Sequence, residues 1–110
     1  MEGFIRGDVV VIPFPYSDLT NAKRRPALVI ANSSYNDIIL CQITSKEVKD
    51  SFAISISDDS FTDGSLKKIS NIRPNKIFTA DSNIVLYKIA SLKPQVLNDV
   101  IKRIIEILKS

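Results

Sequence analysis

The chain has 110 residues, of which 45% are hydrophobic, and a formal net charge of +3 at pH 7. This length and composition predict one domain, residues 1–110, with a packed core, and they exclude a largely disordered chain. The longest apolar runs are far shorter than the roughly 18 to 20 residues of a membrane span, so we expect no membrane segment.

Histidine is absent and Cys41 is the only cysteine, so the side chains that usually build a zinc site or a disulfide are missing. We therefore expect no metal and no cofactor. Residues 1–3 lead directly into strand-like sequence, so we expect no signal peptide and a cytoplasmic protein. The positive charge is clustered at 23–25, 67–76 and 102–103, which favours an anionic partner.

Two β-branched, apolar runs near the N-terminus, at 7–14 and 26–32, have the length and composition of buried strands. The segment between them is rich in turn-forming residues. Pro26 has no amide hydrogen, so we expect it to begin the second strand and to hold Arg25 in an extended backbone. Arg25 would then lie at the start of a rigid strand with its guanidinium reaching outward, which suits a residue that binds phosphate.

The next run, Asp37 to Thr44, predicts a third buried strand, which ends in the hydroxyl side chains of Thr44 and Ser45. A charged loop follows, and residues 52–57 then alternate between apolar and polar, as in a half-exposed strand. We expect turns at 58–60 and 62–65, a strand at 66–72 that ends at Arg73, a short strand at 77–80, a turn at 81–83 and an extended segment at 84–90.

An apolar stripe at helical spacing predicts a C-terminal helix. Its members are Leu97, Val100, Ile101, Ile104, Ile105 and Leu108. Ser91 is suited to cap this helix, and Pro94 is suited to its first turn. Several short strands followed by one helix predict a mainly β fold (α+β in class), in which a small, strongly bent sheet or barrel packs against the terminal helix.

Three groups of polar residues are candidates for binding or acting on a phosphate, although each also has an ordinary explanation. The basic run at 23–25 could equally be a solvated loop. Thr44 and Ser45 could bond to their own turn. Arg73 could be a surface arginine, and Asp8, which follows a glycine, is expected to fix a turn.

Four stretches taken together resemble the MazF/PemK/Kid toxins. They are GDVVVIPF at 7–14, KRRPALVI at 23–30, QITS at 42–45 and IR at 72–73. The resemblance covers essentially the whole chain. It implies an SH3-like barrel of the MazF/CcdB type, a homodimer, and a metal-independent, sequence-selective endoribonuclease that cleaves single-stranded RNA and is neutralised by an acidic antitoxin.

By position, Arg25 and Thr44 match the active-site arginine and threonine of this family, and Arg73 matches an arginine that Kid-type members use in cleavage. We expect further RNA contacts from Lys23, Arg24, Ser45, Asn75 and Lys76. Two positions depart from the family pattern. Asp18 is the only carboxylate of the loop at 15–24, and Asn75 stands where an acidic residue is common, so the resemblance leaves the general base unassigned.

Cleavage of RNA without a metal most simply uses the ribose 2′-hydroxyl to attack the adjacent phosphorus. The products would be a 2′,3′-cyclic phosphate and a 5′-hydroxyl. A guanidinium can stabilise the charge that develops on the phosphate oxygens, but it stays protonated at ordinary pH and is a poor base. We therefore expect Arg25 to stabilise the transition state.

Two other classes of protein remain open at this point. A non-catalytic toxin or binding module with the same barrel, like the CcdB toxins, would act through protein or nucleic-acid contacts alone and would have no reason to bring Arg25, Thr44 and Arg73 into one cleft. A small SH3-like domain that binds peptides would need an exposed aromatic groove. The chain has no tryptophan and three tyrosines, which makes such a groove difficult to build.

Overall fold

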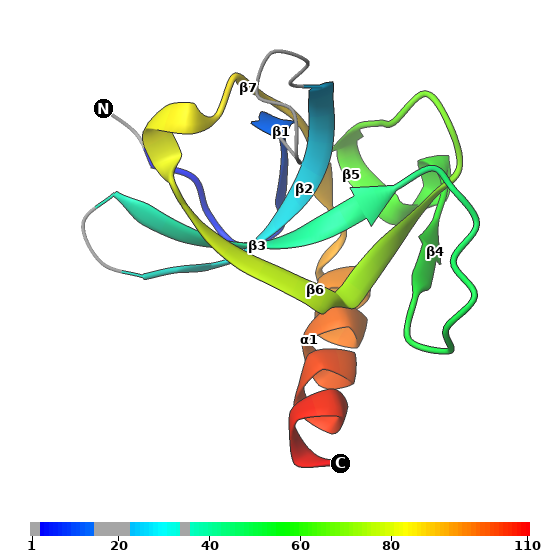
Figure 1. Ribbon diagram of the computed structural model, residues 1–110. Helices are drawn as coiled ribbons and strands as arrows, with labels where there is room; N and C mark the ends of the chain where they lie inside the picture. The colour runs from blue at the N-terminus through cyan, green and yellow to red at the C-terminus, as the bar shows by residue number, and fades with distance from the viewer. Residues whose placement is uncertain (1–2, 15–22, 34–35) are drawn as a thin grey trace.

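The computed structural model describes residues 3–14, 23–33 and 36–110. In these residues seven strands form one antiparallel sheet, and a single α-helix follows them (Figure 1). The strands are β1 (Asp8–Phe14), β2 (Lys23–Asn32), β3 (Asp37–Thr44), β4 (Ile54–Ile56), β5 (Phe61–Gly64), β6 (Ser70–Asp81) and β7 (Tyr87–Leu92), and the helix is α1 (Pro94–Lys109).

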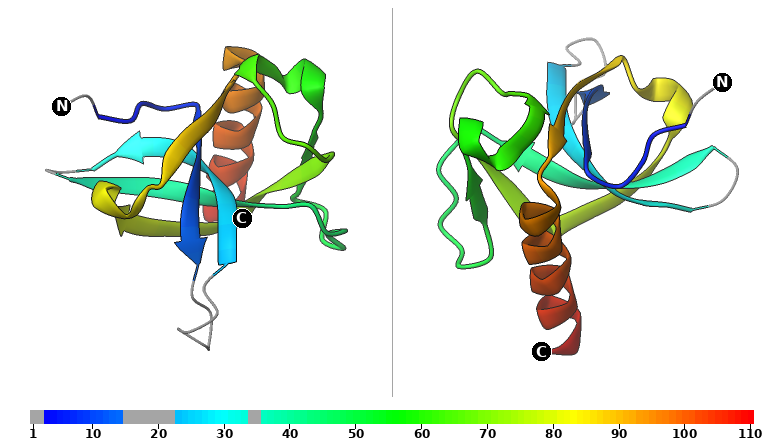
Figure 2. Two further views of the ribbon diagram at one scale, coloured as in Figure 1. Left: turned by 90° about the horizontal axis from the view of Figure 1, so that it is seen from above. Right: turned by 180° about the vertical axis from the view of Figure 1, so that it is seen from behind.

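The strands follow the order β4-β6-β3-β2-β1-β7-β5 across the sheet. The sheet is so strongly curled that its two edge strands, β4 and β5, lie on the same side of the molecule (Figures 1 and 2). Helix α1 packs beside β6 and projects from the curled sheet (Figure 1). This arrangement confirms the predicted mainly β fold with a bent sheet and a C-terminal helix.

The sheet buries apolar side chains on both faces, because consecutive residues of a strand point to opposite sides. In β2, Leu28 and Ile30 belong to a cluster on the face that α1 covers, together with Val100 and Ile104 of the helix. Ala27 and Val29 belong to a second cluster inside the curl. The remaining core of that second cluster is Val10, Ile12, Ile38 and Leu40.

The structure corrects several predicted boundaries. One long strand, β6, replaces the two strands predicted at 66–72 and 77–80, and it runs through the buried Pro74. The turn predicted at 62–65 is wrong for most of its length, because Phe61–Gly64 form β5, which pairs with β7. Ser91 lies within β7 and does not cap α1, whose N-cap is Lys93. The pattern of a single segment could not reveal a pairing such as that of β5 with β7, because the two strands are distant in sequence.

The prediction that Pro26 begins its strand is wrong. Pro26 lies within β2, opposite Val11 of β1. The pairing of β2 with β3 extends only as far as Ala27 and Gln42. Beyond that pair the described residues give β2 a ladder partner on one side only, so the missing amide hydrogen of Pro26 breaks no hydrogen bond with β3. Arg25 is therefore held inside a strand.

Two further sequence predictions agree with the structure. Strand β3 has the predicted bounds, and Asp8 fixes the turn before β1, where one carboxylate oxygen accepts the backbone N–H of Ile5 at 3.0 Å. The other oxygen lies 3.2 Å from Nζ of Lys88. No helix among the described residues is long and apolar enough to cross a membrane.

Gly64 should not tolerate a side chain, and its replacement tests how closely β5 packs against β7. Its φ is +71°, and a Cβ atom would collide with the backbone of Ile89 and Ala90 in β7. We expect Gly64→Ala to lower the free energy of unfolding by at least the roughly 1–3 kcal/mol of a strained left-handed residue. Gly3→Ala is the matched control, because nothing lies within 4 Å of the added methyl group. Equal urea midpoints for the two variants would contradict the observed packing.

Candidate functional site

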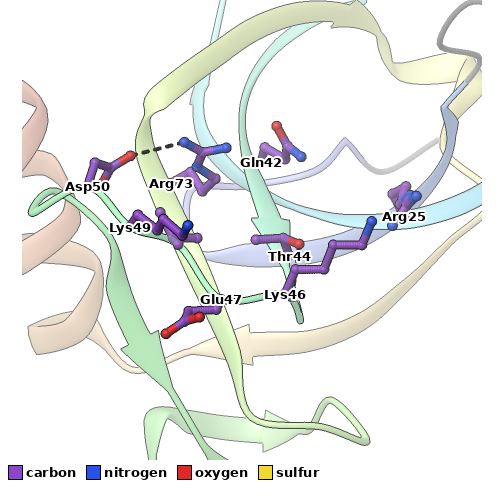
Figure 3. Close-up of a pocket in the computed structure, with 9 residues that line it drawn as sticks. Arg25, Gln42, Thr44, Lys46, Glu47, Lys49, Asp50 and Arg73 are labelled. Atoms are coloured by element: carbon purple, nitrogen blue, oxygen red, sulfur yellow. Dashed lines mark hydrogen bonds and ion pairs between the residues drawn. The ribbon is translucent and has the colours of Figure 1, made fainter.

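A cleft of about 560 Å³ opens at the ends of β2, β3 and β6 (Figure 3). Its lining residues are Arg25, Gln42, Thr44, Lys46, Glu47, Val48, Lys49, Asp50 and Arg73. They come from the three strands and from the loop that follows β3. We refer to the hollow that these residues line as the cleft.

The polar residues of β2 and β3 reach the cleft because of strand alternation. In β3, Gln42 and Thr44 have the same parity as Leu40, and in β2, Arg25 has the same parity as Ala27. These side chains therefore continue the inner face of the curled sheet beyond its apolar part. Since Ala27 pairs with Gln42, extending the antiparallel register by two residues sets Arg25 opposite Thr44.

Arg73 reaches the cleft because the pairing of β6 with β3 is irregular. Cys41 pairs with Ile77 and Ile43 with Ile72, so the partners are two residues apart on β3 but five apart on β6. Extra residues of this kind redirect side chains out of the regular alternation. The thiol of Cys41 donates to the carbonyl oxygen of Arg73 at 2.8 Å. Burial raises the pKa of Cys41 to about 12, so this group stays a protonated donor.

Asp50 pairs with Arg73 across the cleft. Its Oδ2 lies 3.0 Å from Nη2 of Arg73 (Figure 3). Its Oδ1 accepts the backbone N–H groups of Phe52 and Ala53 at 2.9 and 3.2 Å. Desolvation raises the pKa of the Asp50 carboxyl, but the hydrogen bonds from Phe52, Arg73 and Ala53 and the charge of Arg73 together outweigh it. The pKa therefore lies below the ordinary value of 3.8.

The loop that carries Asp50 is held by two other residues. From β6, the side-chain amide of Asn71 donates to the carbonyl oxygen of Lys46 at 3.2 Å. From α1, Nη1 of Arg103 donates to the carbonyl oxygens of Ser51 and Phe52, both at 3.1 Å. The loop is therefore fixed to both the sheet and the helix.

The electrostatics of the cleft favour an anion. Among the described residues, four cationic side chains line it, against the two carboxylates Glu47 and Asp50. Lys46 extends toward Arg25 (Figure 3). Oγ1 of Thr44 accepts the N–H of Lys46 at 3.1 Å, and the hydroxyl can still donate its own hydrogen to a ligand. The arrangement suits a phosphate group with donors on several sides.

The structure brings together the three residues predicted as catalytic, since Arg25, Thr44 and Arg73 all line the cleft. The five predicted RNA contacts lie outside its lining. Lys23, Arg24, Ser45, Asn75 and Lys76 are all exposed. Asn75 nevertheless touches the cleft, because its Nδ2 lies 3.5 Å from Oδ2 of Asp50. Asp18 lies outside the described residues.

Sequence reasoning missed the other six lining residues of the cleft, which are Gln42, Lys46, Glu47, Val48, Lys49 and Asp50. The loop after β3 was visibly charged, and its position after the Thr44–Ser45 pair was the one available signal. Its pairing with Arg73 spans 23 residues of sequence, which no local pattern encodes.

Acidification should reveal the contribution of Asp50 to stability. The folded pKa is below the unfolded value, so the contribution of the carboxylate is complete above the unfolded pKa and is lost as the pH falls through the folded one. We expect the difference in unfolding free energy between the unaltered chain and Asp50→Asn to be constant above about pH 5 and to shrink as the pH falls further. Urea unfolding measures it, and a pH-independent difference would contradict the ion pair.

Among solved structures, the chain is similar in fold to MazF (Form-I) from Deinococcus radiodurans, with a TM-score of 0.76, 19% identity and complete coverage (100% of each chain). It is also similar to an endoribonuclease in complex with its cognate antitoxin from a mycobacterial species, with a TM-score of 0.75, 14% identity and coverage of 99% and 96% of the two chains. A MazE–MazF complex (Form-III) from Deinococcus radiodurans gives a TM-score of 0.76, with 18% identity and 98% coverage of each chain.

Identities this low demonstrate a shared fold. Comparison with curated protein sequences gave no significant match. A family model, however, matches almost the entire chain, residues 5–108. The chain therefore belongs to the PemK-like, MazF-like toxins of type II toxin–antitoxin systems.

Proposed function

We propose that the chain is a metal-independent, sequence-selective endoribonuclease toxin that cleaves single-stranded RNA and is neutralised by a cognate acidic antitoxin. One observation carries the proposal. Arg25, Thr44 and Arg73, which come from three different strands, line one cleft, and in the part of the chain that the structure describes its cations outnumber its carboxylates four to two. A module that only binds protein would have no need for this convergence.

In the proposed reaction, the ribose 2′-hydroxyl attacks the adjacent phosphorus and loses its proton to a base. The bond from phosphorus to the 5′-oxygen breaks, and that oxygen takes up a proton. The products are a 2′,3′-cyclic phosphate and a 5′-hydroxyl. Since the cations of the cleft can neutralise the charge that develops on the phosphate oxygens, the proposed step needs no metal ion.

Arg25 and Arg73 stabilise this charge as bidentate donors, and Thr44 positions the phosphate or the 2′-hydroxyl. Arg25 is fixed by the paired backbone of β2, and Arg73 by its ion pair with Asp50. Donors held in place before the substrate arrives lose little free energy to reorganisation during the reaction. Lys23, Arg24, Ser45, Asn75 and Lys76 contact the RNA beyond the scissile phosphate.

An acidic antitoxin segment would neutralise the toxin by occupying the cationic cleft. The similar structures include MazF in complex with MazE and an endoribonuclease in complex with its cognate antitoxin. The toxin acts as a homodimer in the cytoplasm. We expect pairing to cover some of the large apolar side chains that remain exposed on the single chain, among them Ile5, Ile69 and Leu108, which are 64–76% exposed.

Replacing Arg25 tests the catalytic assignment. Loss of a fixed donor to a developing oxyanion costs roughly 100- to 1,000-fold in rate, so Arg25→Ala should nearly abolish cleavage of a long RNA in EDTA. Arg25→Lys should restore little, because the bidentate geometry is gone. Thr44→Ala should lose less. Arg6→Ala, an exposed arginine outside the cleft, is the control and should cleave normally. Cleavage by Arg25→Ala at the unaltered rate, or products with 3′-hydroxyl ends, would refute the mechanism.

The salt dependence of binding tests the RNA contacts. Each of Lys23→Ala, Arg24→Ala and Lys76→Ala should weaken binding of a non-cleavable RNA regardless of its sequence. Each should also reduce the slope of log affinity against log salt by about 0.7, since one phosphate contact is lost. Lys109→Ala, at the far end of α1, should leave the slope unchanged. Identical slopes for all four variants would return the three residues to the status of solvated surface charges.

A further inference from the structure

The Asp50 carboxylate is the point at which the loop after β3 meets strand β6. One of its oxygens, Oδ1, accepts two backbone N–H groups of its own loop, at Phe52 and Ala53. The other, Oδ2, faces β6, where it lies 3.0 Å from Nη2 of Arg73 and 3.5 Å from Nδ2 of Asn75. One side chain thereby joins the backbone of the loop to two side chains of the strand.

These contacts make Asp50 unsuited to accept a proton from substrate. An ionised carboxylate offers about four lone-pair positions, and four donors already face the two oxygens. The hydrogen bonds and the charge of Arg73 also stabilise the ionised form. The group is therefore better placed to hold its partners than to take part in proton transfer.

The partner that it holds is a residue of the cleft. The ion pair engages Nη2 of Arg73, and Nε of the same side chain is buried without a hydrogen-bond partner among the described residues. Arginine has five N–H donors in a rigid plane, so fixing one nitrogen orients the rest. Because Arg103 and Asn71 bind the loop on both sides of Asp50, the carboxylate itself has little freedom to move.

We propose that Asp50 is a positioning residue for cleavage, which fixes the guanidinium of Arg73 in the cleft, and that Asn75 supports it as a second, neutral donor. The inference rests on the proposed ribonuclease function. It also assigns a role to the amide at position 75. The carboxylate beside Arg73 comes from the loop, and strand β6 contributes a hydrogen-bond donor to it through Asn75.

The substitution Asp50→Asn isolates this role. Asparagine keeps an oxygen that can accept the N–H groups of Phe52 and Ala53, so the loop should keep its turn. Its amide, however, would present a donor to the Arg73 guanidinium, which has only donors. Asn75→Asp adds a carboxylate instead of removing one. It sets this second carboxylate close to Oδ2 of Asp50, where like charges repel.

The double variant Asp50→Asn/Asn75→Asp exchanges the two groups. It restores one carboxylate and one amide beside Arg73, with the carboxylate now on β6. If Asp50 were needed only for folding of the loop, this exchange would restore no activity. If Asp50 orients Arg73 through its charge, the carboxylate at position 75 should partly replace it. The effect of Asn75→Asp should therefore change sign between the two backgrounds.

The experiment measures kcat and KM for cleavage of one RNA in EDTA by the unaltered chain, the two single variants, the double variant and Arg25→Ala. Urea unfolding gives the folded fraction, so that rates are expressed per folded molecule. We expect Asp50→Asn to lower kcat by up to about 100-fold, as a misplaced reacting group does, with KM little changed. Asn75→Asp alone should lower kcat, and the same substitution in the Asp50→Asn background should raise it.

Each other outcome is decisive. Full activity of Asp50→Asn beside an inactive Arg25→Ala would overturn the role of Asp50 and leave the ribonuclease function standing. A rise in kcat for Asn75→Asp in the unaltered chain would also overturn it, as would additive effects in the double variant. If Asp50→Asn does not fold, Asn75→Asp alone decides, because position 75 is exposed. Absence of cleavage by the unaltered chain would overturn the proposed function, and this inference with it.

Discussion

The break in register between β3 and β6 is the constraint on which the cleft depends. Between the pairs Cys41–Ile77 and Ile43–Ile72, strand β6 contains three more residues than β3. Pro74, which has no amide hydrogen, is buried in this irregular stretch, where the ladder does not require one. In a regular β6, strict alternation would send the side chains of Arg73 and Ile77 to the same face of the sheet. The irregular strand lets its side chain reach Asp50 while its carbonyl oxygen receives the Cys41 thiol.

The remainder of the site is a continuation of the core. Along the inner face of the curled sheet, the apolar residues Ala27 and Leu40 give way to Arg25, Gln42 and Thr44 on the same strands. The polar groups are thus attached to backbone that buried neighbours and ladder hydrogen bonds hold in place. Sites built on strands in this way keep their geometry more precisely than sites built on loops. The loop after β3 also lines the cleft, but it is held more firmly than a free loop because both the sheet and the helix bind it.

Charge balance explains why carboxylates belong in a cleft that suits a phosphate. Two arginines and two lysines around one hollow repel one another when no anion is bound. Asp50 offsets part of this repulsion through its ion pair with Arg73. The cleft can therefore stay assembled in the absence of substrate and still attract a phosphodiester.

Sequence alone determined those features whose causes are local. A continuous apolar run predicted β3, and the helical spacing of apolar residues predicted the terminal helix. The succession of short strands before one helix predicted the bent sheet. The order of Arg25, Thr44 and Arg73 along the chain was sufficient to nominate them, through resemblance. Their convergence required the sheet, because it arises from the pairing of β2 with β3 and of β3 with β6. The tertiary structure alone decided that Asp50 pairs with Arg73, that β6 passes unbroken through Pro74, and that Pro26 lies inside β2. Each of these depends on which strand lies beside a given residue, and residues close in sequence carry no information about neighbours 23 positions away.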